Sequence, residues 1–420
     1  MATGIPTPNL RKKNKIELNY EGKRSAVEIL SPIQTNIDLV YESHSLNQLY
    51  FGDNFEVLHH LIQDPQICGK VKLIYIDPPF STQTTFYSRQ QKHAYTDNFN
   101  HAEYVQFLRE RLFLLHYLLA DDGSIYVHLD EKMVFEIKII MDEIFGSANY
   151  RNLIVRKKCN PKNYTRKTYG NISDFILFYT KSEKYIWNRP VEPLSAESQK
   201  EYQYTEPETG RKFMKVPIHA PGSRNGDTGK SWRGQLPPPG KHWQYTPKKL
   251  DEMDARGEIY WSKNGNPRRK VYLDTHLGVG IQDIWLDFKD AHNQNIKITG
   301  YPTEKNQNLL KRIISASSNQ DDLVLDCFAG SGTTLAVADE LERNWIGVDN
   351  SPEALQTILK RFRVGLQKMG DFVEKQASSQ ISLFDNEPDL FESEPLIDKF
   401  SLFSTTEDKE SVLKLTDIPF

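Results

Sequence analysis

The hydrophobic pattern of the first 150 residues alternates between strand-like and helix-like segments. Apolar residues in LNQLYF precede a Gly-Asp turn and the amphipathic run NFEVLHHLI, which is the order strand, turn, helix. The run VKLIYID at 71–77 predicts a buried parallel strand, which ends where two prolines remove the backbone donors of the ladder. Further amphipathic helices and a short strand follow, so the pattern predicts a doubly wound α/β sheet.

The alternation stops at about residue 150 and resumes near residue 300. Residues 151–289 mix strand-like pieces with Gly, Pro, Trp, Tyr and basic residues. The segment DDLVLDCFAGSGTTLAVADELERNWIGVDNS then repeats the order strand, glycine loop, helix, strand. We therefore expect an N-terminal extension at 1–34, one half of the sheet at 35–150, an insertion at 151–289, the other half at 290–370 and a polar, disordered tail at 371–420.

The composition is that of an ordinary globular protein. The 420 residues are 38% hydrophobic and 26% charged, which predicts two or three packed units. Only three cysteines occur, far apart, so neither a disulfide framework nor a zinc site is expected, and we predict no metal. No stretch approaches the roughly 20 apolar residues of a membrane span, and no apolar core follows the basic N-terminal run, so we expect a cytoplasmic protein without membrane contact.

The formal net charge of −3 conceals a basic middle and an acidic tail. Residues 151–275 hold about 25 Lys and Arg against about 13 Asp and Glu, and the tail has the opposite balance. A basic segment favours a polyanionic partner, with a solvated surface as the alternative. The cluster expected to bind nucleic-acid phosphates lies beside Tyr164 and Tyr169 and consists of Arg156, Lys157, Lys158, Lys162, Arg166 and Lys167.

The glycine turn after the strand 323–326 is a candidate nucleoside site. Its glycines let the backbone approach a ligand closely, but the third glycine of a dinucleotide fingerprint and the lysine of a Walker loop are absent. The next strand ends in Asp349, near the spacing at which a carboxylate takes ribose hydroxyls. S-adenosylmethionine, a nucleoside without phosphates, fits this pattern. The residues expected to bind it are Asp326, Phe328, Ala329, Gly330, Ser331, Gly332, Thr333 and Asp349.

The candidate catalytic element is Asp77-Pro78-Pro79-Phe80, at the carboxyl end of a predicted parallel strand. An exocyclic amine on a base is a poor nucleophile, so its site must hold it by hydrogen bonds. A carboxylate and a backbone carbonyl fixed by two prolines supply acceptors at one place, and the aromatic ring offers a face for stacking. The alternative is a Pro-Pro turn that only ends a strand.

Three motifs in this order resemble the amino-methyltransferases of DNA. DPPF resembles their catalytic motif, DCFAGSGTT their cofactor loop, and TEKNQNLLKRII the helix before that loop. The order is that of the β class, which includes many N6-adenine enzymes and the modification subunits of type III restriction systems. The resemblance spans about residues 45–365. It implies a circularly permuted, Rossmann-like methyltransferase sheet, with 35–150 as the catalytic half, 290–370 as the cofactor half and 151–289 as the target-recognition domain.

The resemblance also implies roles for single residues. The motif begins with Asp77, which is similar to the motif of adenine-directed enzymes, whereas cytosine-N4 enzymes usually begin it with serine. Asp77 is also expected to contact the cofactor. Asp53, in GDN, would lie near the adenosine; a helix cap is the alternative. Thr303 and Lys305, in YPTEK, would bind the methionine carboxylate, although Asn306 replaces the usual proline. For Lys305 the alternative is a solvated helix start.

The expected reaction is methyl transfer from S-adenosylmethionine to adenine N6 in double-stranded DNA. The target base would be flipped into the cleft, where Phe80 receives it. A cytosine-N4 enzyme, or one acting on RNA or on a protein side-chain amide, would keep the same cofactor loop. A non-catalytic binding module is a further alternative. It would require a damaged DPPF motif or glycine loop, and both are intact.

Three protein partners are also expected. The β class is often dimeric, and a restriction subunit is a second expected partner. The third is a sliding clamp, because the segment from Gln380 to Phe384, QISLF, resembles a clamp-binding peptide. Chance, or docking of this segment onto the body of the protein, is the alternative.

Overall fold

The chain forms two compact units in the computed structural model, Met1–Asn188 with Gln282–Phe420, and Arg189–Ile281. The structure describes residues 16–79, 101–161, 167–275, 278–289, 304–365 and 399–416. It also gives the backbone of four short strands, β4 (Thr85–Tyr87), β5 (His93–Thr96), β18 (Lys297–Ile298) and β21 (Gln367–Lys368). The residues with predicted roles that lie outside the described ones are Phe80, Lys162, Tyr164, Arg166, Thr303 and the segment 380–384.

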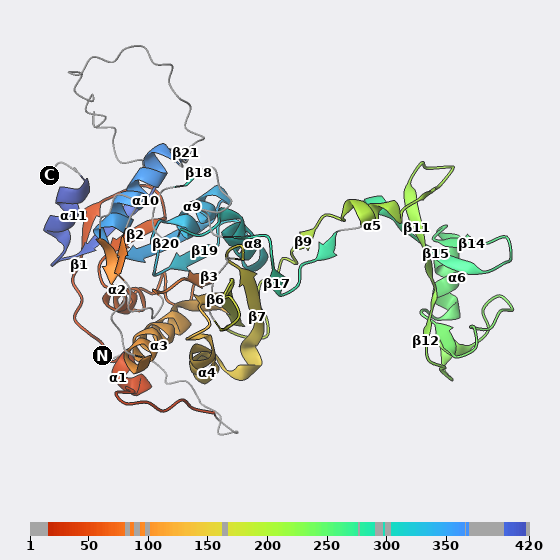
Figure 1. The fold of residues 1–420 in the computed structure, drawn as a ribbon, viewed down its shortest axis with the longest axis horizontal. Coiled ribbons are helices and arrows are strands. Elements are labelled where there is room, and N and C mark those ends of the chain that lie inside the picture. Colours follow the sequence, from red (N-terminus) through yellow and green to blue (C-terminus); the bar gives the residue numbers. More distant parts are fainter. Residues whose placement is uncertain are drawn as a thin grey trace, which may run out of the picture. The chain divides into compact units, whose positions relative to one another are not determined.

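The first unit is built on a ten-stranded sheet with the order β1-β22-β2-β20-β19-β3-β6-β8-β7-β17 (Figure 1). Six neighbouring strands, from β22 to β6, are parallel. The strands are β1 (Ile37–Tyr41), β2 (Gln48–Phe51), β3 (Val71–Ile76), β6 (Leu119–Leu129), β7 (Tyr150–Lys157), β8 (Ser173–Thr180), β17 (Ile284–Trp285), β19 (Leu323–Asp326), β20 (Asn344–Asp349) and β22 (Ser401–Thr405). The expected α/β sheet is confirmed.

The two halves of the sequence are interleaved in this sheet. Strands β19 and β20, from the second half, lie between β2 and β3, which are neighbours along the chain. Leu325 of β19 pairs with Ile74 of β3, and Asp349 of β20 pairs with Phe51 of β2. Since all four strands are parallel, their carboxyl ends meet at one edge of the sheet, where open α/β sheets bind ligands.

Helices cover the sheet and bury their apolar faces on it. They are α1 (Ala26–Leu30), α2 (Asn54–Leu61), α3 (His101–Leu118), α4 (Val134–Phe145), α8 (Gln307–Ser317), α9 (Thr333–Glu340), α10 (Pro352–Val364) and α11 (Lys409–Thr416). The largest core cluster joins α2, α3 and α4 to β3 and β6, and Ile29 of α1 is fully buried in it. Within the described part of the chain, no helix is long and apolar enough to cross a membrane.

The second unit has its own sheet and core. Its sheet has the order β10-β11-β15-β14, and its core contains Trp232, Trp243, Leu250 and Ile259. Its elements are β9 (Val191–Glu192), α5 (Ala196–Lys200), β10 (Tyr204–Thr205), β11 (Lys212–Pro217), β12 (His219–Pro221), β13 (Lys241–Trp243), α6 (Pro247–Ala255), β14 (Ile259–Trp261), β15 (Pro267–Tyr272) and β16 (Val279–Gly280).

This unit is shorter than the predicted insertion at 151–289. The predicted boundaries are wrong because β8 pairs with β6, β7 pairs with β8, and β17 pairs with β7, which places all three strands in the main sheet. The compact insertion therefore runs from residue 189 to residue 281.

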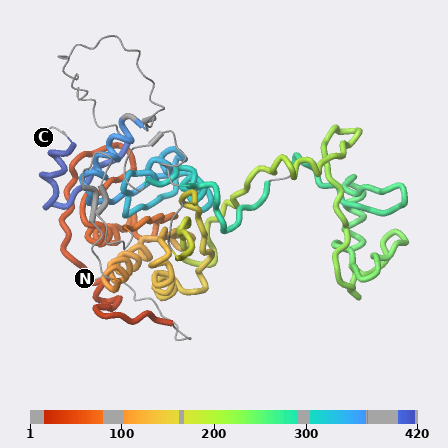
Figure 2. The backbone as a smooth tube through the Cα atoms, viewed as in Figure 1, coloured from red at the N-terminus to blue at the C-terminus, as the bar shows by residue number. Residues whose placement is uncertain are grey.

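The end of the chain is part of the main sheet, so the expectation of a disordered tail is wrong for residues 399–416. Strand β22 lies between β1 and β2, antiparallel to the first and parallel to the second. Figure 2 shows this C-terminal segment, in blue, beside the red N-terminal segment. Phe400 and Leu402 are buried. The short apolar run that contains them, which the sequence pattern assigned to the tail, therefore packs into a hydrophobic core.

Candidate functional site

Four acidic residues lie at the carboxyl ends of four neighbouring parallel strands. Asp53 follows β2, Asp349 ends β20, Asp326 ends β19 and Asp77 follows β3. The order of the strands thus brings together the GDN, DPP and DCFAGSG motifs, which are far apart in the sequence. This is the edge at which the sequence predicts the site.

Asp77 holds one carboxylate oxygen ready for a ligand. Its Oδ2 lies 2.6 Å from Nζ of Lys305. Its Oδ1 is buried, lies 3.9 Å from Nδ1 of His128, and has no hydrogen-bond partner among the described residues. Pro78 is buried and Pro79 half-buried, and proline fixes φ, so the backbone behind this carboxylate is stiff. An unsatisfied buried acceptor favours a ligand that donates an N–H or O–H here.

The glycine loop has the backbone conformation that its sequence requires. Gly330 and Gly332 have φ of 52° and 70°, which side chains other than glycine rarely adopt. A Cβ atom on Gly332 would lie 2.8 Å from Cγ1 of Ile358. The amide of Gly330 donates to Oδ2 of Asp349 at 2.7 Å, so the loop and the carboxylate predicted to take ribose hydroxyls are held together.

Two loop hydroxyl groups contact an ion pair that sequence reasoning missed. Arg361 of α10 lies 3.2 Å from Oγ1 of Thr333 and 3.5 Å from Oγ of Ser331. Its guanidinium pairs with Glu304 at 2.5 Å, and both charged side chains are buried. The side chains of Ser331 and Thr333 therefore fix the loop on α10, and the loop backbone is left for a ligand.

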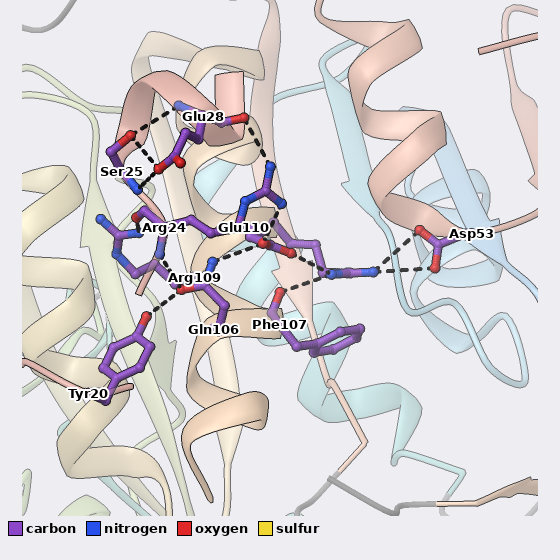
Figure 3. A network of polar contacts seen from close by, with 10 residues as sticks. Tyr20, Arg24, Ser25, Glu28, Asp53, Gln106, Phe107, Arg109 and Glu110 are labelled. Atoms are coloured by element: carbon purple, nitrogen blue, oxygen red, sulfur yellow. Dashed lines mark hydrogen bonds and ion pairs between the residues drawn. The ribbon is translucent and has the colours of Figure 1, made fainter. Parts of the chain in front are cut away.

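Asp53 is a helix cap that lies at the same edge of the sheet, and its role at the adenosine stays a prediction. It accepts a hydrogen bond from the amide of Phe55 at 2.8 Å, so the alternative of a helix cap is correct. Both of its oxygens lie 3.3 Å from Arg111, yet 48% of its side chain is exposed. Figure 3 shows Asp53 at one end of a polar network that continues to Glu110 and Arg24.

Asn54 and Arg111 connect this cap to the glycine loop. Asn54 donates to the carbonyl of Cys327 at 2.8 Å, and Nε of Arg111 donates to Oδ1 of Asn54 at 2.5 Å. The guanidinium lies over the ring of Phe107, 3.7 Å from its centroid, and this ring lies beside Phe328 of the loop. No signal in the sequence predicted this connecting role for Arg111, because in the sequence it is one of several charged residues on an amphipathic helix.

The site is acidic, which suits a cationic nucleoside. Burial, together with the nearby charges of Asp77 and Asp349, raises the pKa of Asp326 to about 7. Burial also raises the pKa of Asp349, although amides of Ser351 and Gly330 donate to it. Mutually repelling carboxylates beside a glycine loop would reject phosphates and are stabilised by a sulfonium or an ammonium group. These residues therefore fit S-adenosylmethionine, and the contact of Asp349 with the ribose stays a prediction.

Replacing Asp326 with asparagine is expected to stabilise the ligand-free protein at high pH. The folded state keeps this carboxyl protonated up to about pH 7, while the unfolded chain releases the proton near its ordinary value of 3.8. The wild type therefore loses stability as the pH rises from about 4 to about 7. Relative to wild type, Asp326→Asn should gain on the order of a few kcal/mol across this interval. Urea denaturation of both proteins at several pH values checks this, and a pH-independent difference would contradict it.

The structure corrects the predicted DNA role of Arg156. This side chain is fully buried, donates to the carbonyl of Phe288 at 2.6 Å and pairs with Asp174 at 2.8 Å. It points inward because alternate residues of β7, Ile154 and Arg156, face the interior. Among the described members of the cluster, Lys157 and Lys158 are half-buried and Lys167 is exposed, so their DNA contacts stay a prediction.

Comparison with known proteins identifies the family. The model of a family described as DNA methylase matches residues 71–360. The chain is 48% identical over 377 residues to the type II methyltransferase M.EcaI of Enterobacter cloacae, covering 88% of this chain and 82% of the relative. It is 28% identical over 351 residues to the type III restriction-modification enzyme StyLTI Mod subunit of Salmonella typhimurium, covering 74% of this chain and about half, 52%, of that subunit.

A solved structure is also similar. The crystal structure of an M1.HpyAVI-SAM complex matches with 20% identity and a TM-score of 0.42, over 76% of this chain and 99% of that chain. The family match and the extent of the identity to M.EcaI confirm the expectation of a DNA methyltransferase with S-adenosylmethionine as methyl donor. The chain belongs to the DNA methylase family.

Proposed function

We propose that this protein methylates adenine at N6 in double-stranded DNA. The observation that carries the proposal is the buried Oδ1 of Asp77, which has no hydrogen-bond partner among the described residues and lies at the edge that holds the glycine loop. A flipped adenine would present its exocyclic N–H groups to this oxygen. The aspartate that opens the DPPF motif supports adenine over cytosine, in whose enzymes serine usually stands.

The residues around Asp77 fit the needs of this reaction. S-adenosylmethionine, when bound, supplies an activated methyl group. The carboxylate accepts a hydrogen bond from the amine and so directs the nitrogen lone pair away from the ring plane. Asp77 would accept the proton that the nitrogen releases when the bound donor supplies its methyl group. Lys305, at 2.6 Å, pairs with the other oxygen of this carboxylate and holds it in place before the step.

One experiment identifies the methylated base. The protein is incubated with S-adenosylmethionine labelled in its methyl group and with unmethylated duplex DNA, which is then digested to nucleosides and separated. Label in N6-methyldeoxyadenosine supports the proposal. Label in N4-methyldeoxycytidine would replace adenine by cytosine, and label only in an RNA or protein control would overturn a DNA substrate.

The second unit offers a basic and aromatic face for DNA. Lys215 of β11 lies 3.5 Å from the ring centroids of both Tyr204 and Tyr260. Tyr260 of β14 pairs with Arg268 of β15, which is exposed. Cations and aromatic rings together suit phosphates and sugars. We infer that this face, defined by Tyr204, Lys215, Tyr260 and Arg268, contacts the DNA.

Neutralising this face is expected to weaken DNA binding and lower its salt dependence. The double variant Lys215→Ala, Arg268→Ala should reduce the slope of log K against log salt by about 2, since each phosphate contact contributes about 0.9. The matched control replaces Lys248 and Lys249, two exposed lysines at the start of α6, and should leave the slope unchanged. Fluorescence anisotropy at several salt concentrations measures both. Equal slopes for the two double variants would reject this face.

We also propose a restriction endonuclease as a functional partner, because one relative is named as the Mod subunit of a restriction-modification enzyme. A homodimer stays a prediction.

A further inference from the structure

A line of buried polar side chains crosses the sheet, starting from Asp77. His128 of β6 lies next to it, followed by Asp174 of β8 and Arg156 of β7, so each residue comes from the next strand of the sheet. The distance from Oδ1 of Asp77 to Nδ1 of His128 is 3.9 Å. Nε2 of His128 lies 3.0 Å from Oδ2 of Asp174, which lies 2.8 Å from Nη1 of Arg156.

This line is removed from water. The exposed fractions of His128, Asp174 and Arg156 are 0%, 2% and 0%. Burying ionised groups is costly, and apolar residues of similar size usually stabilise a fold as well or better. The pairing of the strands does not explain the line either, because β6 pairs with β8, and β8 with β7, through their backbones. The reaction proposed for Asp77 uses none of the three.

The far end of the line fixes the charge and position of Asp174. Burial raises the pKa of this carboxyl, but His128, Arg156 and Lys305 outweigh burial and hold the pKa well below its usual range. Asp174 is therefore ionised at neutral pH. The guanidinium of Arg156 is itself held by the carbonyl of Phe288, at 2.6 Å. The ring of His128 thus lies against an immobile anion.

The near end of the line fixes the other ring nitrogen. The hydroxyl of Tyr75, on the strand that leads to Asp77, lies 2.8 Å from Nδ1 of His128. Burial raises the pKa of Tyr75 well above its ordinary value, so this hydroxyl stays protonated. With Asp174 at one nitrogen and Tyr75 at the other, the imidazole has one defined orientation. Its Nδ1 edge faces the oxygen of Asp77 that is offered to the substrate.

We propose that His128 is a positioning residue for Asp77, and that Asp174 acts through it. This inference rests on the proposed function of Asp77. Lys305 holds one oxygen of the carboxylate at 2.6 Å, and the imidazole limits the rotation of the other. The carboxylate plane is then fixed before the target amine arrives. This matters because misplacing a catalytic group by about 1 Å can cost on the order of 100-fold in rate.

The test compares methyl-transfer kinetics of wild type, His128→Gln, Asp174→Asn and the double variant. We expect each single variant to lower kcat by about 10- to 100-fold, with KM for DNA and affinity for S-adenosylmethionine within about twofold of wild type. If Asp174 acts through His128, the double variant should lose no more than His128→Gln alone. Asp174→Asn is the more conservative change, and retained cofactor binding shows that a variant is folded.

The matched control is Tyr126→Phe. Tyr126 is buried on the same strand as His128 and loses a hydrogen bond of 2.7 Å to Ser317 in this variant, without contact to Asp77. Its kcat should equal that of wild type even though its unfolding free energy falls. A wild type that transfers no methyl group to DNA would overturn the proposed function. An active wild type with kcat values for both single variants equal to that of Tyr126→Phe would overturn the role of His128 alone.

Discussion

Replacing Asp77 with alanine is expected to lower methyl transfer by about 10²- to 10⁴-fold. The variant loses a buried carboxylate oxygen that has no hydrogen-bond partner among the described residues, and with it the acceptor for the amine proton. Cofactor affinity should change little, because the loop backbone and Asp349 are held by each other. Single-turnover kinetics with labelled donor, together with equilibrium dialysis of S-adenosylmethionine, separates the two effects.

Two further variants sharpen this result. Asp77→Asn keeps an acceptor oxygen and loses the charge that pairs with Lys305, so its activity should lie between wild type and Asp77→Ala. Asp349→Ala should show the opposite profile, with cofactor affinity lost first, because its carboxylate holds the loop at Gly330. Near-normal turnover of Asp77→Ala would remove this residue from the reaction.

The parallel part of the sheet was predictable from the sequence because each of its central strands is a continuous apolar run ended by a special turn. VKLIYI stops at two prolines, and LVLD stops at a glycine loop. Both motifs then had to lie at carboxyl ends, where such sheets bind ligands. What the pattern could not show is the strand order, since the pairing of Leu325 with Ile74 joins residues that are far apart in the chain.

The misassigned residues share one cause, which is that local composition does not reveal a distant partner. The basic run that contains Arg156 resembles a phosphate-binding cluster, but the alternation of β7 and the acid on β8 direct this side chain inward. Because alternate side chains of a strand face the same side, counting by two from Ile154 would have shown that Arg156 points inward. It would not have shown which residue pairs with Arg156. His128 and Arg111 were missed for the same reason, because each gains its role only from residues on other elements.

Strand β22, near the C-terminus, packs against the part of the sheet that leads to the predicted cofactor site. Thr405 of β22 occupies the space beside Gly52, where a Cβ atom on the glycine would lie 2.5 Å from Cγ2 of this threonine. Gly52 directly precedes the cap residue Asp53. Phe400 lies against Trp345 of β20, with ring centroids 5.3 Å apart. Strand β22 therefore supports β2 next to Asp53, a residue predicted to bind the nucleoside, and Phe400, just before β22, supports the opposite end of β20.

Ending the chain at residue 398 is therefore expected to destabilise the protein severely and to abolish cofactor binding. The deletion removes Phe400, Leu402 and Val412, all buried, each contributing about 1.5–3 kcal/mol, against a total stability of roughly 5–15 kcal/mol. It also leaves β1 and β2 without the strand that joins them. Urea denaturation and dialysis with labelled S-adenosylmethionine measure both losses, and ending the chain at residue 416 is the control that keeps β22 and α11. A protein ending at 398 that binds the cofactor as the control does would show that β2 holds the GDN motif without this strand.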